Sequence, residues 1–222
     1  VYKRQKDKYC ALAKPGQFLM LWIPGVDEIP LSVMDAENGV VSVTVKEVGD
    51  ATRHLHGMKQ GEIIGVRGPY GNIFTETSGN VLLVGGGTGT APLLFLAKRL
   101  KAKNRRLSFV VGAKTKTELL FLKDLDQVCS EESLLTTTED GTYGLKCLVA
   151  EPLTGLLARQ KFDMIYTCGP ELMVSKIFNL ADQHGIPFEA SLERLMRCGI
   201  GLCGSCVIGK YRVCKDLSLI HI

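Results

Sequence analysis

Short apolar runs separated by turn residues fill the first third of the chain. The runs lie at residues 18–23, 40–48 and 62–67, and turns rich in Gly, Pro and Asn lie at 24–25, 37–39 and 69–72. Runs of this length and spacing are typical of a small antiparallel barrel or sandwich. The pattern predicts an all-β region up to residue 77, with one short helix at most, near residues 50–58.

From residue 80 the pattern changes to apolar strands that alternate with helical periods. We expect strands at 81–84, 107–112, 133–137, 164–167 and 187–190, and helices at 91–103, 117–125, 152–159 and 171–184. Pro92 falls in the first turn of its helix and Gly185 follows the end of the last helix, as helix start and stop signals require. This alternation is the signature of βαβ units around a parallel sheet.

The fold class expected from these patterns is a β barrel plus an α/β domain. The barrel is expected at residues 1–77 and the α/β domain, with a parallel sheet, at 78–193. Residues 194–222 are rich in Gly and Cys and are expected to form a small separate loop and ribbon region rather than core.

Composition excludes several classes of protein. The chain has 27 Lys and Arg against 23 Asp and Glu, and a net charge of +4 is too weak to indicate a nucleic-acid partner. The uncharged apolar stretch at residues 81–97 contains four glycines and is shorter than the roughly 20 apolar residues of a membrane-spanning helix. The first residues are polar and basic, without the apolar region of a signal peptide, so we expect a cytoplasmic protein with no membrane contact.

A glycine-rich turn joins the first strand of the α/β region to its helix. Its residues are Gly85, Gly86, Gly87, Thr88 and Gly89. Glycine lets the backbone approach a phosphate closely, and a helix N-terminus offers free N–H groups and the positive end of its dipole. We expect the turn to bind the pyrophosphate of a dinucleotide, and an ordinary tight strand-to-helix turn is the alternative. No Gly-Lys-Ser/Thr follows, which favours a nucleotide cofactor over nucleotide hydrolysis.

Four of the eight cysteines crowd into the end of the chain. Cys198, Cys203, Cys206 and Cys214 have the spacing C-x4-C-x2-C-x7-C, and its opening matches plant-type iron–sulfur sites. Glycines in the loop allow its N–H groups to point at sulfur, and residues 207–213 predict a two-stranded ribbon that returns the last cysteine to the third. A structural zinc ribbon is the alternative, although it usually shows two matched Cys pairs. We expect a [2Fe–2S] cluster in a reducing compartment.

The two motifs together predict a third cofactor. A nicotinamide exchanges a hydride, which carries two electrons, whereas a [2Fe–2S] cluster passes one electron at a time. A flavin has three accessible oxidation states and can convert between the two. The β-rich region at residues 1–77 is then expected to hold the flavin.

Six segments of the sequence match the motifs of one known family. They are Pro30-Leu31-Ser32, Gly49-Asp50-Ala51-Thr52, Gly68-Pro69-Tyr70-Gly71-Asn72, Gly85 to Leu93, Thr167-Cys168-Gly169-Pro170, and Cys198 to Cys214. On these segments the chain resembles, over nearly its whole length, the electron-transfer subunits of class B dihydroorotate dehydrogenase, within the ferredoxin–NADP reductase superfamily. The resemblance implies a six-stranded FAD barrel, a nucleotide-binding α/β domain and a C-terminal [2Fe–2S] loop.

The resemblance also implies particular FAD contacts. The family's Arg-Pro-x-Ser-like stretch is replaced here by Ile29-Pro30-Leu31-Ser32, so its arginine is absent, and Lys46 is the expected substitute as partner of an FAD phosphate. Barrel packing is the alternative role for all these positions. The other flavin-contacting positions of the family correspond to Thr44, Val45, Lys46, Ala51 and Thr52.

The resemblance also implies which residues contact the nicotinamide. Cys168, followed by Gly169 and Pro170, corresponds to the family's cysteine beside the nicotinamide, although an isolated cysteine is more often a buried core thiol. Residues 136–141 lack an arginine to pair with a 2′-phosphate, and their carboxylates would repel one. We therefore expect NAD rather than NADP.

The resulting hypothesis is an oxidoreductase subunit that passes electrons from a dihydroorotate-oxidising partner, through [2Fe–2S] and FAD, to NAD+ in pyrimidine biosynthesis. The resemblance implies a catalytic partner chain and a heterotetramer. One alternative is the related small subunit of NADH-dependent ferredoxin:NADP oxidoreductase or sulfide dehydrogenase, which the missing arginine at Ile29 keeps open. Another is a non-enzymatic module that holds structural zinc and binds a nucleotide.

Overall fold

The computed structural model describes residues 2–216 and 220–221, so the last part of the predicted 194–222 region lies partly outside the described residues. The described chain forms two compact units. One contains the residues up to Ile73 together with those from Arg194 to 216, and the other contains Phe74–Glu193 with 220–221. The Cys-rich segment thus belongs to the same unit as the N-terminal sheet.

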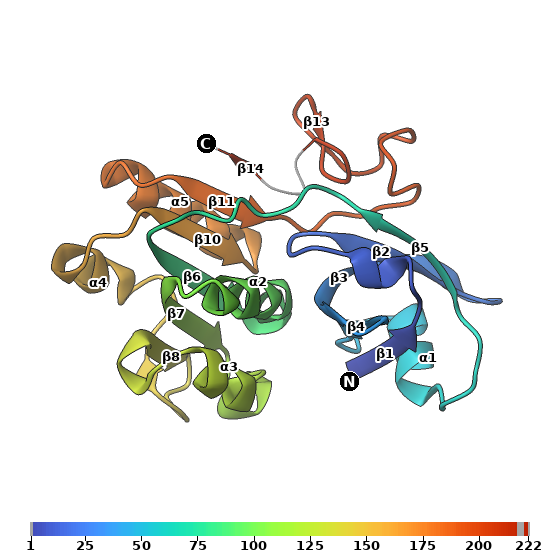
Figure 1. Cartoon of the computed structure of the whole chain (residues 1–222), viewed down its shortest axis with the longest axis horizontal. Helices are drawn as coiled ribbons and strands as arrows, with labels where there is room; N and C mark the ends of the chain where they lie inside the picture. The colour runs from blue at the N-terminus through green and yellow to red at the C-terminus, as the bar shows by residue number, and fades with distance from the viewer. Residues whose placement is uncertain (1, 217–219, 222) are drawn as a thin grey trace. The chain divides into compact units, whose positions relative to one another are not determined.

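The first unit is built on an antiparallel sheet of five strands in the order β1-β4-β3-β2-β5 (Figure 1). Most residues of β2 and β4 are buried, which accounts for their apolar sequences. The 3₁₀ turn Cys10–Leu12 follows β1, and the helix α1 (Asp50–Gly57) connects β4 to β5. The strands are β1 (Tyr2–Lys6), β2 (Phe18–Ile23), β3 (Asp27–Glu37), β4 (Val40–Thr44) and β5 (Gly65–Tyr70).

The expected antiparallel barrel region is confirmed as an antiparallel sheet, but its details differ from the prediction. The described residues contain five strands rather than the six that the resemblance implied. The run at 40–48 ends as a strand at Thr44, because the chain then turns into α1, and the run at 62–67 starts as a strand only at Gly65. The sequence pattern missed β1 and β3, since β1 is polar and β3 carries Pro30 and four carboxylate residues.

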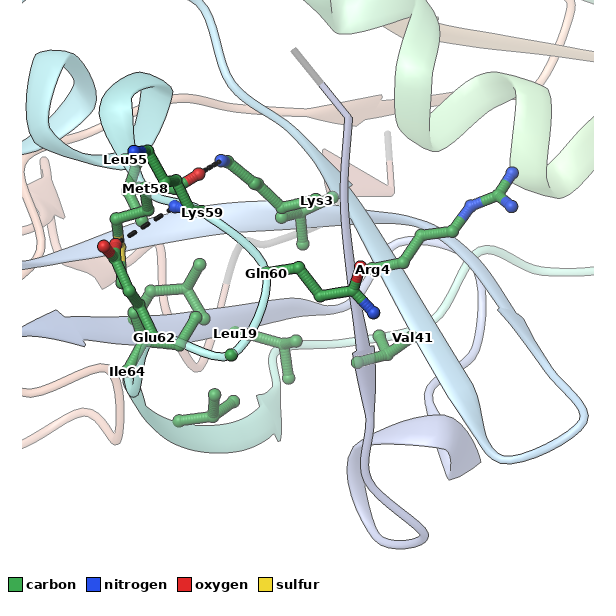
Figure 2. Close-up of a pocket in the computed structure, with 14 residues that line it drawn as sticks. Lys3, Arg4, Leu19, Val41, Leu55, Met58, Lys59, Gln60, Glu62 and Ile64 are labelled. Carbon is green, nitrogen blue, oxygen red and sulfur yellow. Dashed lines mark hydrogen bonds between the residues drawn. The ribbon is translucent and has the colours of Figure 1, made fainter.

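A cavity of about 420 Å³ lies inside this unit, and residues from both edge strands line it (Figure 2). Lys3 and Arg4 of β1 and Val66 of β5 contribute to the lining, together with Leu19 and Val41 from the central strands. The ammonium group of Lys3 donates to the carbonyl of Met58 at 2.9 Å. The two edge strands therefore flank an internal space instead of pairing with each other.

The second unit is built on a sheet of seven strands in the order β14-β11-β10-β6-β7-β8-β9. All neighbours are parallel except β14, which runs antiparallel to β11. The strands are β6 (Asn80–Gly86), β7 (Arg106–Ala113), β8 (Leu134–Thr138), β9 (Leu145–Lys146), β10 (Met164–Cys168), β11 (Phe188–Ser191) and β14 (Ile220–His221).

Helices cover both faces of this sheet. Leu82 and Val84 of β6 pack in one buried cluster with Leu153 of α4 and Ile177 of α5. The helix α2 contacts β6, β7 and β10 as well as α3, and because side chains alternate along a strand, it covers the opposite face. The helices are α2 (Thr90–Ala102), α3 (Leu122–Val128), α4 (Leu153–Arg159) and α5 (Glu171–Gln183), with 3₁₀ turns at Gly87–Gly89, Lys116–Glu118 and Glu131–Ser133.

The five strands expected in the α/β region are all present, and three of the four helices lie where the periodicity placed them. The exception is the helix predicted at 117–125. There the chain forms a 3₁₀ turn and then starts α3 only after Phe121, whose φ of 64° is left-handed. Leu119 and Phe121 are buried, so tertiary packing overrides the local helical pattern.

The Cys-rich segment contains the expected ribbon. Strands β12 (Val207–Ile208) and β13 (Tyr211–Arg212) pair antiparallel and turn at Gly209 and Lys210. Within residues 2–216 and 220–221, no helix is long and apolar enough to cross a membrane.

Candidate functional site

The glycine turn and the Cys168 segment lie at adjacent strand ends in the parallel sheet. Strand β6 is followed in the chain by β7 and β8 on one side, whereas β10 and β11 lie on its other side. The strand order therefore reverses between β6 and β10, where Gly85 pairs with Cys168. In open parallel sheets, ligands bind outside the carboxyl ends of the strands at such a switch point.

The two segments are in close backbone contact. A Cβ on Gly89 would lie 2.3 Å from the carbonyl oxygen of Cys168 and 2.7 Å from the nitrogen of Gly169. A Cβ on Gly86 would lie 2.6 Å from the sulfur of Met173 and 3.0 Å from Pro170. The glycines are thus required here by the close packing of the turn against residues 168–173, and the turn leads directly into the N-terminus of α2.

The Cys168 side chain is buried at the end of β10, with an exposed fraction of 2%. Burial raises the pKa of this thiol to about 12, and the nearby Glu193 carboxylate adds to the effect. The thiol is therefore neutral at physiological pH. This environment suits an uncharged contact group and does not suit a nucleophile, which would need a lowered pKa.

In the first unit, three of the predicted FAD residues line one cavity of about 480 Å³. Ile29 contributes from β3, and Ala51 and Thr52 contribute from the first turn of α1. Pro30, Leu31 and Ser32 follow along β3 and are half-buried, but they are not part of the cavity lining. The arginine expected at position 29 is replaced by an apolar side chain that faces the cavity.

Thr52 fixes the shape of this cavity. Its hydroxyl accepts the N–H groups of Val48 and Gly49, both at 2.9 Å, and donates to the Gly49 carbonyl at 2.8 Å. These bonds hold the turn that begins α1. The first N–H groups of an α-helix have no partner within the helix, so they are suited to an anionic ligand. Thr52 therefore positions the backbone of this site.

The remaining predicted FAD residues, Thr44, Val45 and Lys46, precede the cavity-lining residues 48–52 in the sequence. Thr44 ends β4, Val45 is buried, and Lys46 is exposed. The Thr44 hydroxyl contacts the sulfur of Met34 at 3.0 Å. Lys46, the expected substitute for the arginine, does not line the 480 Å³ cavity.

Backbone N–H groups surround the first cysteine of the Cys-rich segment. The N–H groups of Leu202 and Cys203 lie 3.4 and 3.5 Å from Cys198 Sγ. Hydrogen bonds from the Cys203 and Ile200 backbone lower the pKa of the Cys198 thiol to about 6. The loop therefore favours a thiolate at this position, which is the form that binds metals.

Cys206 and Cys214 lie next to each other, as expected from the predicted ribbon. The Cys214 N–H lies 3.4 Å from Cys206 Sγ, and the Gly201 N–H lies 3.2 Å from Cys214 Sγ. Both side chains are buried. Burial and the adjacent Cys206 thiol raise the pKa of Cys214 to about 11.

This pairing fits a binuclear cluster. The Cys203 N–H donates to Cys198 Sγ, and the Cys214 N–H donates to Cys206 Sγ. A [2Fe–2S] centre takes two protein ligands on each iron, so this arrangement by pairs is compatible with such a centre. Among residues 2–216 and 220–221, no group of three or more His, Cys, Asp or Glu side chains is arranged to hold a metal ion.

Two arginines at this site were not predicted from the sequence. Arg67 of β5 donates to both carboxylate oxygens of Glu28 at 2.7 Å and to the carbonyl of Cys198 at 3.2 Å. Arg212 of β13 binds Asp216 and the carbonyl of Gly201. Neither contact has a sequence signal, because an arginine in a strand is ordinarily a solvated side chain.

Residues 83–178 match the family model of the oxidoreductase NAD-binding domain. Over 205 residues the chain is 43% identical to the Methanocaldococcus jannaschii protein named "Probable dihydroorotate dehydrogenase B (NAD(+)), electron transfer subunit", and the match covers 91% of this chain and 77% of that protein. The corresponding protein of Pyrococcus furiosus is 42% identical over 202 residues, with the same coverage. The chain belongs to the family of dihydroorotate dehydrogenase B electron transfer subunits.

A solved structure supports the same fold for this member of the family. The NADH-dependent reduced ferredoxin–NADP oxidoreductase, studied for flavin-based electron bifurcation, superposes with a TM-score of 0.87 and 34% identity. The alignment covers 99% of this chain and 82% of that one. The ferredoxin-reductase-like fold, with one antiparallel and one parallel sheet, is therefore confirmed for the electron-transfer subunit described here.

Proposed function

We propose that this chain is an electron-transfer subunit that exchanges electrons between a dihydroorotate-oxidising partner chain and NAD+. The observation that carries the proposal is the arrangement of the four clustered cysteines in pairs, in which the Cys203 N–H donates to Cys198 Sγ and the Cys214 N–H donates to Cys206 Sγ. The same unit contains the cavity lined by the predicted FAD residues. When bound, FAD converts between the one-electron exchange of a [2Fe–2S] cluster and the hydride exchange of NAD.

The FAD would be held by the first turn of α1 and by β3. The first N–H groups of α1 and the cavity beside Ile29 suit a pyrophosphate, because anions bind at helix N-termini. Thr52 keeps this turn in place. The other FAD contacts that we propose are Pro30, Leu31, Ser32, Thr44, Val45, Lys46 and Ala51.

The nucleotide would be held by the turn at Gly85–Gly89 and by Cys168-Gly169-Pro170. The switch-point position and the packing of Gly89 on Cys168 support this assignment. We propose Cys168 as the residue beside the nicotinamide, where its neutral thiol would exclude water without acting as a nucleophile.

NAD is proposed in preference to NADP. The loop after β8 carries Glu139 and Asp140 exposed to solvent. Hydrogen bonds from Thr142 lower the pKa of Asp140, so its carboxylate is charged at neutral pH. Two negative charges at this loop oppose a 2′-phosphate.

An exposed apolar surface around the cluster segment supports a protein partner. Ile200 is 42% exposed, Leu202 80%, Val207 45% and Tyr211 44%. Apolar residues gathered beside an electron-transfer centre are suited to a docking interface. We propose that the catalytic dihydroorotate dehydrogenase chain binds here, in a heterotetramer. All eight cysteines are free thiols in the structure, which is compatible with the cytoplasm as its compartment.

A second candidate keeps the cofactors and changes the partner. The 34% identity to the NADH-dependent reduced ferredoxin–NADP oxidoreductase, with the apolar Ile29 at the FAD cavity, favours the small subunit of such an enzyme. Co-purification from the native source separates the two candidates. A barrel-type dihydroorotate dehydrogenase supports the first, and a large glutamate-synthase-like flavoprotein supports the second.

The cofactor assignment is tested by the visible spectrum of the chain purified without air, before and after NADH is added. We expect flavin bands over a broad iron–sulfur absorbance, both bleached by NADH. A colourless protein that contains zinc would overturn the proposal and support a nucleotide-binding zinc module instead.

A further inference from the structure

We propose that Arg212 is a positioning residue that sets the hydrogen bond donated to the Cys198 sulfur, and through it the reduction potential of the centre bound there. The inference rests on the proposed function, because it assumes that Cys198 is a cluster ligand. It adds a residue that is not one of the four cysteines and that lies between Cys206 and Cys214, near the opposite end of the segment from Cys198.

The connection runs through one peptide group. Arg212 Nη1 donates to the carbonyl oxygen of Gly201 at 2.8 Å. That carbonyl belongs to the peptide whose N–H is carried by Leu202, and this N–H donates to Cys198 Sγ at 3.4 Å. The guanidinium and the sulfur therefore lie at the two ends of the same peptide dipole.

The guanidinium is itself held in one orientation. Its Nε and Nη2 donate to the two carboxylate oxygens of Asp216 at 2.8 and 3.0 Å. The Arg212 backbone N–H donates to the same carboxylate at 2.9 Å, and the Asp216 N–H donates back to the Arg212 carbonyl. This bidentate ion pair fixes the plane of the guanidinium group and directs its Nη1 at the Gly201 carbonyl.

The two peptide groups of Gly201 donate hydrogen bonds to sulfurs of both cysteine pairs. Its own N–H donates to Cys214 Sγ at 3.2 Å, while its carbonyl lies on the peptide that serves Cys198. Gly201 is buried and has a φ of +81°, a conformation that side-chain-bearing residues rarely adopt. A shift of this residue would change the donors to both pairs at once.

The expected electrostatic consequence follows from hydrogen-bond cooperativity. A charged donor on a carbonyl polarises its peptide and strengthens the hydrogen bond that the N–H of the same peptide donates. Hydrogen bonds to cluster sulfurs are one of the factors that set iron–sulfur potentials. Since they stabilise the more negative, reduced state, the Arg212 contact raises the midpoint potential.

A purely structural role makes a different prediction. The Arg212–Asp216 pair is partly exposed, with side-chain exposures of 39% and 27%, and exposed ion pairs contribute little to stability. If the pair only stabilised the ribbon, its loss would change the melting temperature. The midpoint potential would then shift only by the amount that the loss of one positive charge from the ribbon produces.

The test compares Arg212→Gln with Lys210→Gln by redox titration of the whole chain. Electron paramagnetic resonance monitors the reduction state of the centre during the titration. Lys210 is the matched control, because its ammonium belongs to the same ribbon and lies 5.2 Å from the Tyr211 ring. We expect a lower midpoint potential in Arg212→Gln than in Lys210→Gln. We also expect hydrogen–deuterium exchange at the Leu202 amide to speed up on the order of tenfold in Arg212→Gln only.

Arg212→Lys separates charge from geometry and carries the test if Arg212→Gln does not fold. It keeps the positive charge but lacks the planar fork. We expect its potential to fall as well. Equal potentials in Arg212→Gln and Lys210→Gln, or a wild-type potential in Arg212→Lys, would overturn the inference while leaving the cluster assignment intact. A wild-type chain without a [2Fe–2S] signal would overturn the proposed function, and this inference with it.

Discussion

A Cβ on Gly89 would lie 2.3 Å from the carbonyl oxygen of Cys168. The neighbour is backbone at the end of a central strand, so it cannot move aside as a flexible side chain would. The glycine turn and the Cys168 segment therefore depend on each other for their positions. This contact joins the two halves of the proposed nucleotide site.

We predict that Gly89→Ala disrupts this site. Overpacking against fixed backbone is expected to cost about 1–3 kcal/mol in the free energy of unfolding and to weaken NADH binding by at least about tenfold. Urea denaturation and NADH titration measure the two effects. Gly155→Ala in α4 is the control, because nothing lies within 4 Å of a Cβ there, and alanine is the better helix former by about 1 kcal/mol. Unchanged NADH affinity in Gly89→Ala would contradict the assigned contact.

We predict that Thr52→Val weakens FAD binding. The substitution removes three hydrogen bonds from the turn that begins α1, and a lost helix cap costs about 1–2 kcal/mol. Fluorescence titration of the flavin-free chain measures FAD affinity. Thr52→Ser keeps the hydroxyl and is expected to restore most of it. If Thr52→Ser binds FAD as weakly as Thr52→Val, the hydroxyl is not the relevant group.

Arg67 is predicted to hold the Cys-rich segment against the sheet. Its guanidinium donates to both carboxylate oxygens of Glu28, and this ion pair raises the pKa of the guanidinium. Its third hydrogen bond is donated to the carbonyl of Cys198. Arg67→Ala is expected to cost about 1 kcal/mol, because the pair is partly exposed, and to lower the iron retained on purification.

The control for Arg67 is Lys103→Ala, which removes the Lys103–Glu76 ion pair of the other unit. An exposed pair of this kind is expected to contribute less than about 1 kcal/mol, and the iron content should stay at the wild-type level. Iron analysis and thermal melting distinguish the two variants. Equal iron content in both would show that the Cys198 carbonyl contact is dispensable.

The buried Cys168 thiol predicts a specific dependence of stability on pH. Burial raises its pKa from 9.0 to about 12, so the unfolded thiol ionises first as pH rises. This contribution to stability is complete below pH 9 and is lost as pH rises toward 12. We expect Cys168→Ala to show a shallower fall in unfolding free energy over the lower part of this window. The less buried Cys147 is the comparison. Burial and the Glu151 carboxylate also raise its pKa, and we expect Cys147→Ala to change the slope less than Cys168→Ala does. Identical slopes in all three proteins would contradict the assignment.

Local patterns in the sequence predicted the parts of the structure that depend on neighbouring residues. Strand β6, the glycine turn and α2 follow one another within 23 residues, from Asn80 to Ala102, and the apolar period alone places them. The ribbon that returns Cys214 to Cys206 was equally predictable, because Gly209 and Lys210 form its turn. The hydrogen bond between these two cysteines spans only eight positions.

Contacts between distant residues could not be predicted in this way. Arg67 and Cys198 are 131 positions apart, and no periodicity relates them. Strand β1 is polar because it lies at a sheet edge, so its apolar signal is absent. Thr52 was predicted as a flavin contact by resemblance, whereas its hydroxyl bonds to Val48 and Gly49 emerge only from the folded turn.

The return of the Cys-rich segment to the N-terminal sheet constrains the order of events during synthesis. Arg67 leaves the ribosome long before Cys198 exists, and the whole nucleotide-binding unit is made between them. Because domains tend to fold as they emerge, the N-terminal sheet lacks its contact with the Cys-rich segment until the residues from Arg194 onward have been made. A chain arrested after residue 193 would contain residues 74–193 of the nucleotide-binding unit and none of the four clustered cysteines. Insertion of the proposed cluster would therefore have to follow synthesis of these residues, which gives the cell a point after it at which to separate cluster-loaded molecules from shorter fragments.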